Sequence, residues 1–197
     1  MLRRLASTAL LALCLAGPVV AGEPAIDPAA RNPPPTVALS TFDHFELQPV
    51  TLAPGLEAHR GNVIAAQYLQ VDLGERVPKL IDARNALPPD ADVRTLVIHP
   101  EVSDIRFITG GKRVLFGGFA GKSWALVTLH LIDKTTGEVI AEPQFLQHAN
   151  SIFAGYSLGA ADKLMLARLA DMVASYIKTN FDAPVGSAVA TSAPAMD

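Results

Sequence analysis

Residues 110–146, GGKRVLFGGFAGKSWALVTLHLIDKTTGEVIAEPQFL, decide the fold, because they join a glycine-rich run, an alternating segment, a tight turn and a second apolar segment. The alternating segment has two sets of side chains, which are Ala125, Val127, Leu129 and Leu131 on one side and Leu126, Thr128, His130 and Ile132 on the other. This period of two is the period of a β-strand. Asp133 begins the turn and Gly137 supplies the positive φ that lets residues 138–146 return, so the stretch predicts a β-hairpin.

Two elements are predicted before the hairpin. Residues 42–52 alternate as a strand does, and Pro49 costs that strand a hydrogen bond, so we expect an edge or bulged position. Residues 63–87 carry apolar side chains at helical spacing. Pro78 interrupts this pattern, which predicts either one kinked helix or two shorter helices joined near Gly74.

The remaining elements complete the predicted fold. Residues 93–99 and 102–108 are rich in β-branched and aromatic side chains and predict a long strand bent at Pro100. Residues 161–179 have apolar side chains at intervals of three and four, the pattern of an amphipathic helix. The order β-α-β-β-β-α predicts one α+β domain, with a mixed, mostly antiparallel sheet and two helices packed on one face.

The N-terminus has the features of a secretory signal. Arg3 and Arg4 precede an apolar run over residues 5–20, and small residues before Gly22 suit cleavage after Ala21. The run is interrupted by Gly-Pro and is shorter than the roughly 20 apolar residues of a spanning helix. We therefore interpret residues 1–21 as a signal peptide, and expect a protein of the periplasm, or a secreted one.

Cys14 is the one cysteine of the 197 residues and lies inside this leader. A lipidation site prefers a small residue before the cysteine, whereas Leu13 stands here, so a lipid anchor through Cys14 is the alternative interpretation. Cleavage after Ala21 leaves no thiol, and it leaves 14 basic and 19 acidic residues, a net charge of −5 with neutral histidines. An acidic chain argues against nucleic-acid binding, which needs a basic footprint.

The composition separates two tails from the folded part. Residues 22–36 are rich in Pro and Ala, and residues 183–197 have a similar character. Neither segment has the periodic apolar pattern of a helix or strand. The sequence therefore predicts an unstructured tether over 22–36, a folded domain over 37–182 and an unstructured tail over 183–197.

The segment GGFAGKS, residues 117–123, imitates a phosphate-binding loop that would use Lys122. That motif needs four residues between its outer glycines, whereas Gly117 and Gly121 enclose three. It also needs a helix after the loop, and the residues from Trp124 on have a strand pattern. We interpret these glycines as a bulge or close backbone contact at a strand entry, with nucleotide binding as a lesser alternative.

The segment GYSLG, residues 155–159, matches the nucleophile elbow of serine hydrolases, with Ser157 as the nucleophile. The elbow requires an acid and then a histidine later in the chain. All five histidines precede Ser157; they are His44, His59, His99, His130 and His148. A serine hydrolase is therefore the alternative function, and the preferred interpretation is that Ser157 caps the last helix.

The other polar residues predict no metal or cofactor site. The histidines lack the close spacing of metal ligands, so a site would have to be assembled from distant segments. Glu101, Asp162 and Asp171 are expected to be solvated surface charges. Trp124 stands opposite the Val127 side of its strand, and we expect it to pack in a core or half-buried position.

Residues 116–140, FGGFAGKSWALVTLHLIDKTTGEVI, followed by GYSLG and a closing helix, resemble the bacterial envelope family called domain of unknown function 4410. The resemblance extends over residues 42–181. It implies an exported protein or lipoprotein and supplies no catalytic residues. Taken with the leader, it predicts a non-enzymatic envelope module without a cofactor, whose partner is an envelope protein or glycan.

Overall fold

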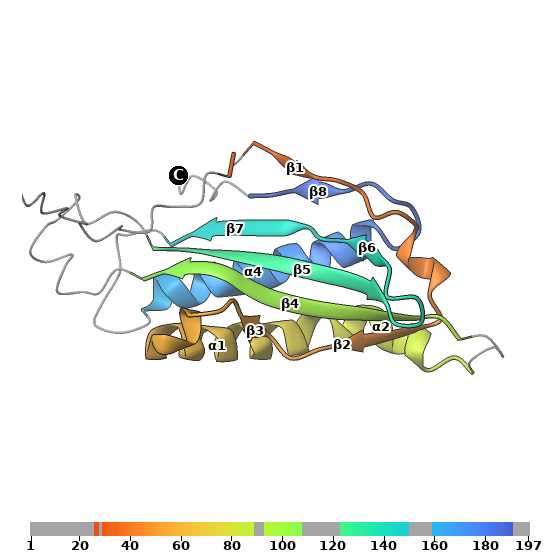
Figure 1. Ribbon diagram of the computed structural model, residues 1–197, viewed down its shortest axis with the longest axis horizontal. Coiled ribbons are helices and arrows are strands. Elements are labelled where there is room, and N and C mark those ends of the chain that lie inside the picture. The colour runs from red at the N-terminus through yellow and green to blue at the C-terminus, as the bar shows by residue number, and fades with distance from the viewer. Residues whose placement is uncertain (1–25, 28, 89–92, 108–122, 150–158, 191–197) are drawn as a thin grey trace, which may run out of the picture.

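A six-stranded mixed sheet carries helices on one face (Figure 1). The computed structural model describes residues 26–27, 29–88, 93–107, 123–149 and 159–190. The strands of this sheet are β2 (His44–Leu47), β3 (Thr51–Leu52), β4 (Thr95–Arg106), β5 (Trp124–Asp133), β6 (Val139–Ala141) and β7 (Gln144–His148). The helices are α1 (Arg60–Arg76), α2 (Pro78–Asn85) and α4 (Ala160–Thr179), with short 3-10 turns at Leu39–Thr41 (η1) and Leu56–Ala58 (η2).

The pairing of the strands confirms the predicted fold class. At the centre, β4 and β5 are antiparallel, and β6 and β7 extend the sheet from β5 in the same sense. At the other edge, β2 and β3 both run parallel to β4. A parallel pair needs a crossover, which α1 and α2 supply between β3 and β4. The result is an α+β domain with a mixed, mostly antiparallel sheet.

The hairpin forms where the sequence predicts it. Gly137 has φ of 73°, and the Asp133 carboxylate accepts hydrogen bonds from the backbone N–H groups of Thr135 and Thr136, at 2.9 and 3.2 Å. The helix-facing core takes Ala125, Val127, Leu129 and Leu131 from β5, as the alternation requires. Trp124 and Leu126 face the other way and join a smaller cluster.

Element boundaries differ from the sequence prediction at three prolines. The first strand is divided into β2 and β3 at Pro49, and the helix breaks at Val77–Pro78 rather than near Gly74. At Pro100 the pairing of β4 with β5 continues in register, and its irregularity lies between Val102 and Asp104. Proline suits the first turn of α2 because the N–H it lacks has no partner there.

Pro100 is tolerated inside β4 because the N–H that proline lacks would not point toward β5. Leu129, its partner on β5, donates its N–H to the Pro143 carbonyl at 2.9 Å, away from β4. Pro100 therefore belongs to a pair without β4–β5 hydrogen bonds. Its nitrogen faces the side of β2 and β3, where the edge is interrupted between Leu47 and Thr51.

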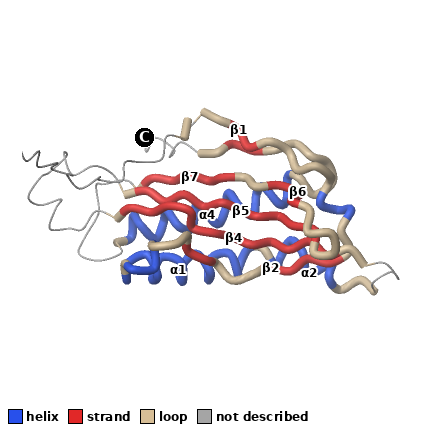
Figure 2. Tube along the Cα trace, in the orientation of Figure 1, coloured by secondary structure: helices blue, strands red, loops and turns tan. Residues whose placement is uncertain are grey.

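The described parts of the terminal segments each contain a short strand, within the stretches where the sequence predicts a tether and a tail. β1 (Arg31–Asn32) pairs antiparallel with β8 (Ser187–Ala188), and Figures 1 and 2 show this pair along the β7 side of the large sheet. Leu146 of β7 donates its N–H to the Val189 carbonyl at 2.9 Å. Gly186 has φ of 80°, and a Cβ there would collide with the Asn32 carbonyl. Both ends of the described chain thus close one edge of the sheet.

These terminal segments also cover part of the sheet face opposite the helices. A second apolar cluster there contains Trp124, Leu126, Leu146 and Val189, with Ile26, Ala30 and Ala190 packed against it. Trp124 is 2% exposed, so the core position expected for it is confirmed. The cover is supplied by the termini and not by a helix.

On each edge of the large sheet, an asparagine side chain pairs with the backbone of one residue as a neighbouring strand would. Asn85, the last residue of α2, accepts from the Phe45 N–H at 2.8 Å and donates to the Phe45 carbonyl at 3.0 Å. At the other edge, Asn32 accepts from the Gln144 N–H at 2.9 Å and donates to its carbonyl at 2.8 Å. An unpaired edge invites association with another chain. Both amides block such pairing at these positions.

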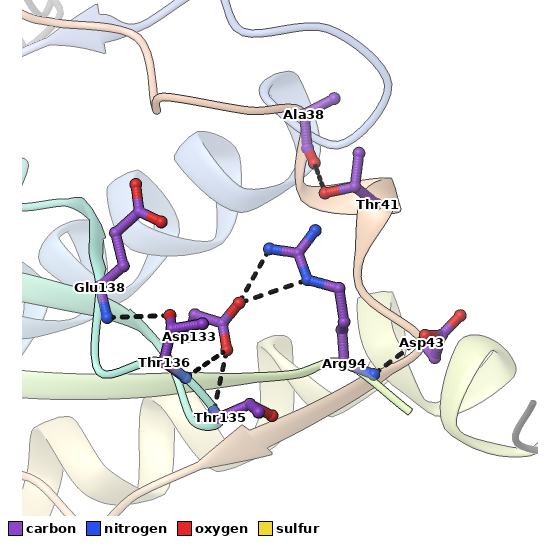
Figure 3. A network of polar contacts seen from close by, with 8 residues as sticks. All are labelled: Ala38, Thr41, Asp43, Arg94, Asp133, Thr135, Thr136 and Glu138. Atoms are coloured by element: carbon purple, nitrogen blue, oxygen red, sulfur yellow. Dashed lines mark hydrogen bonds and ion pairs between the residues drawn. The ribbon is translucent and has the colours of Figure 1, made fainter. Parts of the chain in front are cut away.

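A polar network fastens the hairpin turn to the start of β4 (Figure 3). Arg94 donates two hydrogen bonds to the buried Asp133 carboxylate, at 2.8 and 3.3 Å. Its guanidinium lies 4.5 Å from the centre of the Phe42 ring, and its backbone N–H donates to Asp43. The hydrogen bonds from Arg94, with those from the Thr135 and Thr136 backbones, hold the Asp133 pKa below its ordinary value although desolvation opposes them.

Candidate functional site

One concave surface of the described chain is a groove of about 870 Å³ between the edge strand β3 and helix α1. Its apolar lining residues are Val50, Leu52, Pro54, Val63, Ala66 and Val71. Its polar lining residues are Thr51, Glu57, Gln67 and Gln70, of which Glu57 alone is charged. A concave apolar surface with a few polar groups is the usual form of a binding site.

The backbone of β3 forms one wall of this groove. On the β3 side of the Pro49 break, Ala53 donates its N–H group inward, to the Val102 carbonyl of β4. Because N–H directions alternate along a strand, the N–H groups of Val50 and Leu52 point outward. Val50 donates to the side-chain oxygen of Gln70 on α1, at 2.7 Å. The groove therefore runs along the hydrogen-bonding edge of the sheet.

Gln70 satisfies the edge of β3 less completely than Asn85 satisfies the edge of β2. Asn85 exchanges two hydrogen bonds with one residue, so Phe45 has both its donor and its acceptor satisfied. Gln70 makes one hydrogen bond within the described residues, and its amide nitrogen donates to none of them. The β2 half of the edge is closed by α2, whereas the β3 half is held by a single contact that a ligand can replace.

The α1 wall presents an apolar side chain to solvent at the mouth of the groove. Val71 is 60% exposed, among the largest fractions for an apolar side chain in the described chain. One helical turn earlier, Gln67 is exposed as well, while Ala66 below it is buried. Leu69 and Leu73 occupy the opposite side of α1, in the main core. α1 thus packs its inner face in the core and leaves Gln67 and Val71 exposed beside the groove.

The sheet face opposite the helices carries a second group of polar residues. The His99 and His130 rings face each other across β4 and β5, with centroids 5.5 Å apart. His130 lies 2.9 Å from the Glu142 carboxylate and 3.8 Å from that of Glu101. His99 shares a 2.9 Å hydrogen bond with the Thr51 hydroxyl. Thr51 also lines the groove, so β3 connects the two surfaces.

Beside His99 lies a shallow hollow of about 320 Å³. Its wall is formed by Gln48, Pro49, Thr51, Val97, His99 and Ile132. Among the described residues, no three His, Cys, Asp or Glu side chains converge as ligands of one metal ion. Over the same residues, no helix combines the length and the apolar character needed to cross a membrane.

The residues that imitate catalytic motifs fall outside the described part of the chain. Lys122 and Ser157 both lie there, so the nucleotide and hydrolase alternatives stay predictions. The capping role predicted for Ser157 also falls outside the described residues, in which α4 begins at Ala160 with Gly159 as its N-cap. Asp162 supplies the capping side chain, accepting from the Gly159 N–H at 3.2 Å.

The predicted surface carboxylates have three different environments. Asp162 is 5% exposed, so its prediction as a solvated charge is wrong, and one of its oxygens has no partner among the described residues. Asp171 is mainly exposed and accepts from Arg76 at 2.6 Å, as a surface charge can. Glu101 is half-buried beside His130. The sequence does not show this last proximity, which depends on the register of β4 against β5.

The groove between β3 and α1 is not predicted by any pattern in the sequence. Its two walls come from residues 50–54 and 57–71, and Gln70 meets Val50 only because α1 lies under the strand that precedes it. A signal was present: the Pro49 break and the exposed apolar Val71 lie at the two walls. Neither feature alone distinguishes a groove from an ordinary surface.

No protein-family model matches the sequence, and no curated protein matches it. Solved structures give low similarity: a PelC dodecamer from Paraburkholderia phytofirmans matches with 18% identity over 75% of this chain and 93% of that chain, with a TM-score of 0.35. A hypothetical protein from Chlamydia trachomatis matches with 11% identity over 69% and 98%, with a TM-score of 0.37. A predicted lipoprotein from Caulobacter crescentus matches with 16% identity over 73% and 89%, with a TM-score of 0.31. Similarities this low carry no information about function.

Proposed function

We propose that the protein is exported and acts in the bacterial envelope as a non-enzymatic module that binds another envelope component, a protein or a glycan, in the groove between β3 and α1. The signal-like residues 1–21 support the location. The resemblance of residues 116–140 to domain of unknown function 4410 stays a prediction and agrees with it. Anchoring through Cys14 is the lesser alternative.

The observation that supports the proposal most strongly is the half-covered edge of β3 beside the apolar groove. The groove has an apolar lining that includes Val50, Leu52, Val63 and Val71. Gln70 and Thr51 supply hydrogen-bonding groups at its wall. Burying apolar surface stabilises a complex by about 25 cal/mol per Å². The groove combines this source of affinity with polar groups that can orient a ligand.

The experiment is site-specific photo-crosslinking in intact cells. A benzophenone amino acid replaces Val71 at the mouth of the groove, and in a matched strain it replaces Val139 on β6. Both side chains are exposed and apolar, at 60% and 46%, and Val139 lies on the edge of the sheet opposite to the β2 and β3 edge.

We expect a discrete crosslinked species from Val71 in the envelope fraction and none from Val139. Equal crosslinking at both positions would indicate non-specific contact and would refute the proposal. Absence of any species from Val71 would refute it as well. Mass spectrometry of the crosslinked species distinguishes a protein from a glycan.

A further inference from the structure

The exposed edge of β3 carries chemistry that matches the main chain of an extended peptide. Val50 directs its N–H to an amide oxygen of Gln70 at 2.7 Å, which is the contact that a neighbouring strand would make. Pro49 has no N–H, and Ala53 donates its own to Val102 of β4. The outward-facing donors of this edge are therefore confined to Val50 and Leu52.

We propose that the groove binds an extended peptide segment that adds as a further strand to Val50–Leu52 and inserts alternate apolar side chains between β3 and α1. This inference rests on the proposed function and names its partner as a polypeptide rather than a glycan. Strand addition gives affinity through main-chain hydrogen bonds and specificity through pockets for alternate side chains. Gln70 imitates the first of those hydrogen bonds in the free protein.

The charges favour a segment without acidic residues. Glu57 is the one charged residue of the lining, and the whole chain has a net charge of −3. An acidic peptide would place like charges in a partly apolar groove, which costs free energy. A neutral or basic segment with Val, Ile, Leu or Phe at every second position fits both the lining and the charge.

The two halves of the edge give the inference an internal comparison. Asn85 makes two hydrogen bonds to Phe45 and is held by helix α2, so a peptide gains nothing by displacing it. Gln70 makes one and is partly exposed, so a peptide amide can replace it at the cost of a single hydrogen bond. Binding is therefore expected at β3 and not at β2.

The test uses a displayed library of nine-residue peptides, Lys-Xaa-Thr-Xaa-Thr-Xaa-Thr-Xaa-Lys, in which Xaa is Val, Ile, Leu or Phe. Sequences selected by the full folded protein are resynthesised with a fluorophore, and Kd is measured by anisotropy. We expect a Kd in the micromolar range, because β3 is only two residues long and Val50 and Leu52 supply the outward-facing donors. A library that yields no peptide with a Kd below about 1 mM overturns the inference.

Main-chain pairing is tested with N-methylated copies of the selected peptide. Methylation of one alternate set of amides should weaken binding at least tenfold, and methylation of the other set less than twofold, because only one set faces β3. Equal effects from the two sets would overturn strand addition.

Protein variants separate the groove from a general structural effect. Val71→Arg should weaken binding at least tenfold, whereas Leu164→Arg, at a similarly exposed apolar residue of α4, should change Kd less than twofold. Gln70→Ala should tighten binding several-fold, because the competing amide is removed from Val50. Weaker binding by Gln70→Ala would overturn the inference, since a purely structural role of Gln70 predicts that result.

The outcomes distinguish this inference from the proposed function. A crosslink from Val71 to a glycan, with no peptide binding, would refute the peptide and leave the envelope-binding role standing. Absence of a Val71 crosslink would refute the envelope role, whatever the peptides show. Sedimentation without peptide tests one further occupant: a dimer abolished by Val71→Arg would show that a second copy fills the groove, and would overturn the inference.

Discussion

Asn85→Ala tests most sharply whether side-chain amides close the edges of this sheet. The substitution removes one hydrogen bond accepted from the Phe45 N–H and one donated to the Phe45 carbonyl, at 2.8 and 3.0 Å. Phe45 is 2% exposed and stacks on Phe181, with ring centroids 5.9 Å apart. Two backbone groups would therefore lose their partners beside a packed core.

The expected loss follows from the cost of an unsatisfied backbone group. A buried donor or acceptor without a partner costs about 1–3 kcal/mol. Both bonds are only partly buried, so water can reach the edge, and we expect the free energy of unfolding to fall by about 2–3 kcal/mol in total. For a chain of this size, that loss lowers Tm by roughly 5–10 °C.

Urea unfolding measures this loss, because Trp124 is the one tryptophan of the chain and is buried in the native state. Asn85→Asp keeps an acceptor for the Phe45 N–H and removes the donor, so its loss should be intermediate. Lys79→Ala, at an exposed residue of the same helix, should change the free energy of unfolding by less than about 0.5 kcal/mol. A loss below about 0.5 kcal/mol for Asn85→Ala would show that water replaces the amide and that the edge is not closed in this way.

Three further predictions concern the terminal segments and the titratable groups. Burial raises the pKa of Tyr176 to about 12, so the neutral phenol stabilises the folded state fully below pH 10, and this stabilisation is lost as the pH rises from 10 to 12. Tyr176→Phe should remove this loss of stability in urea titrations at pH 9, 10 and 11. The hydrogen bonds from Arg94 hold the pKa of Asp133 below 3.8, so the carboxylate stabilises the folded state above pH 3.8, and this stabilisation is lost as the pH falls below that value. Between pH 4 and 2.5, the urea midpoint of Asp133→Asn should therefore vary less with pH than the wild-type midpoint. An equal pH dependence of the two midpoints would contradict the role of Arg94. Asn32→Ala should detach the terminal segments and shift the Trp124 emission to longer wavelength with little change in far-ultraviolet dichroism, whereas an unchanged spectrum would show that the segments stay in place.

The fold could be predicted where two independent signals coincide. At the hairpin, the period of two and the polar turn ending in Gly137 agree, and the structure confirms both. The closing helix has a long apolar period and begins at Ala160, within one residue of the prediction. The prolines were recognised, but their consequences depended on which neighbour their missing N–H faced, and that information is tertiary.

The ordered termini and the groove could not be predicted for a different reason. β1 and β8 are two residues long, too short for a period, and they are held by contacts such as Asn32 with Gln144 across a large sequence separation. The groove depends on Gln70 meeting Val50, which no local pattern encodes. The terminal segments are rich in proline and alanine, a composition that predicts no regular structure. It carries no information about the strand edge that these segments cover.

Whether the β3 edge of the sheet receives a partner can be measured directly by amide hydrogen exchange at single-residue resolution. The selected peptide, or the envelope component recovered by crosslinking, is added to the folded protein, and exchange rates are compared with those of the free protein. If a partner pairs with β3, exchange at Val50 and Leu52 should be at least tenfold slower, and exchange at Phe45 should be unchanged because Asn85 already accepts from its N–H. Slowing confined to the sheet face around His99 and His130, with Val50 and Leu52 unaffected, would contradict pairing at β3.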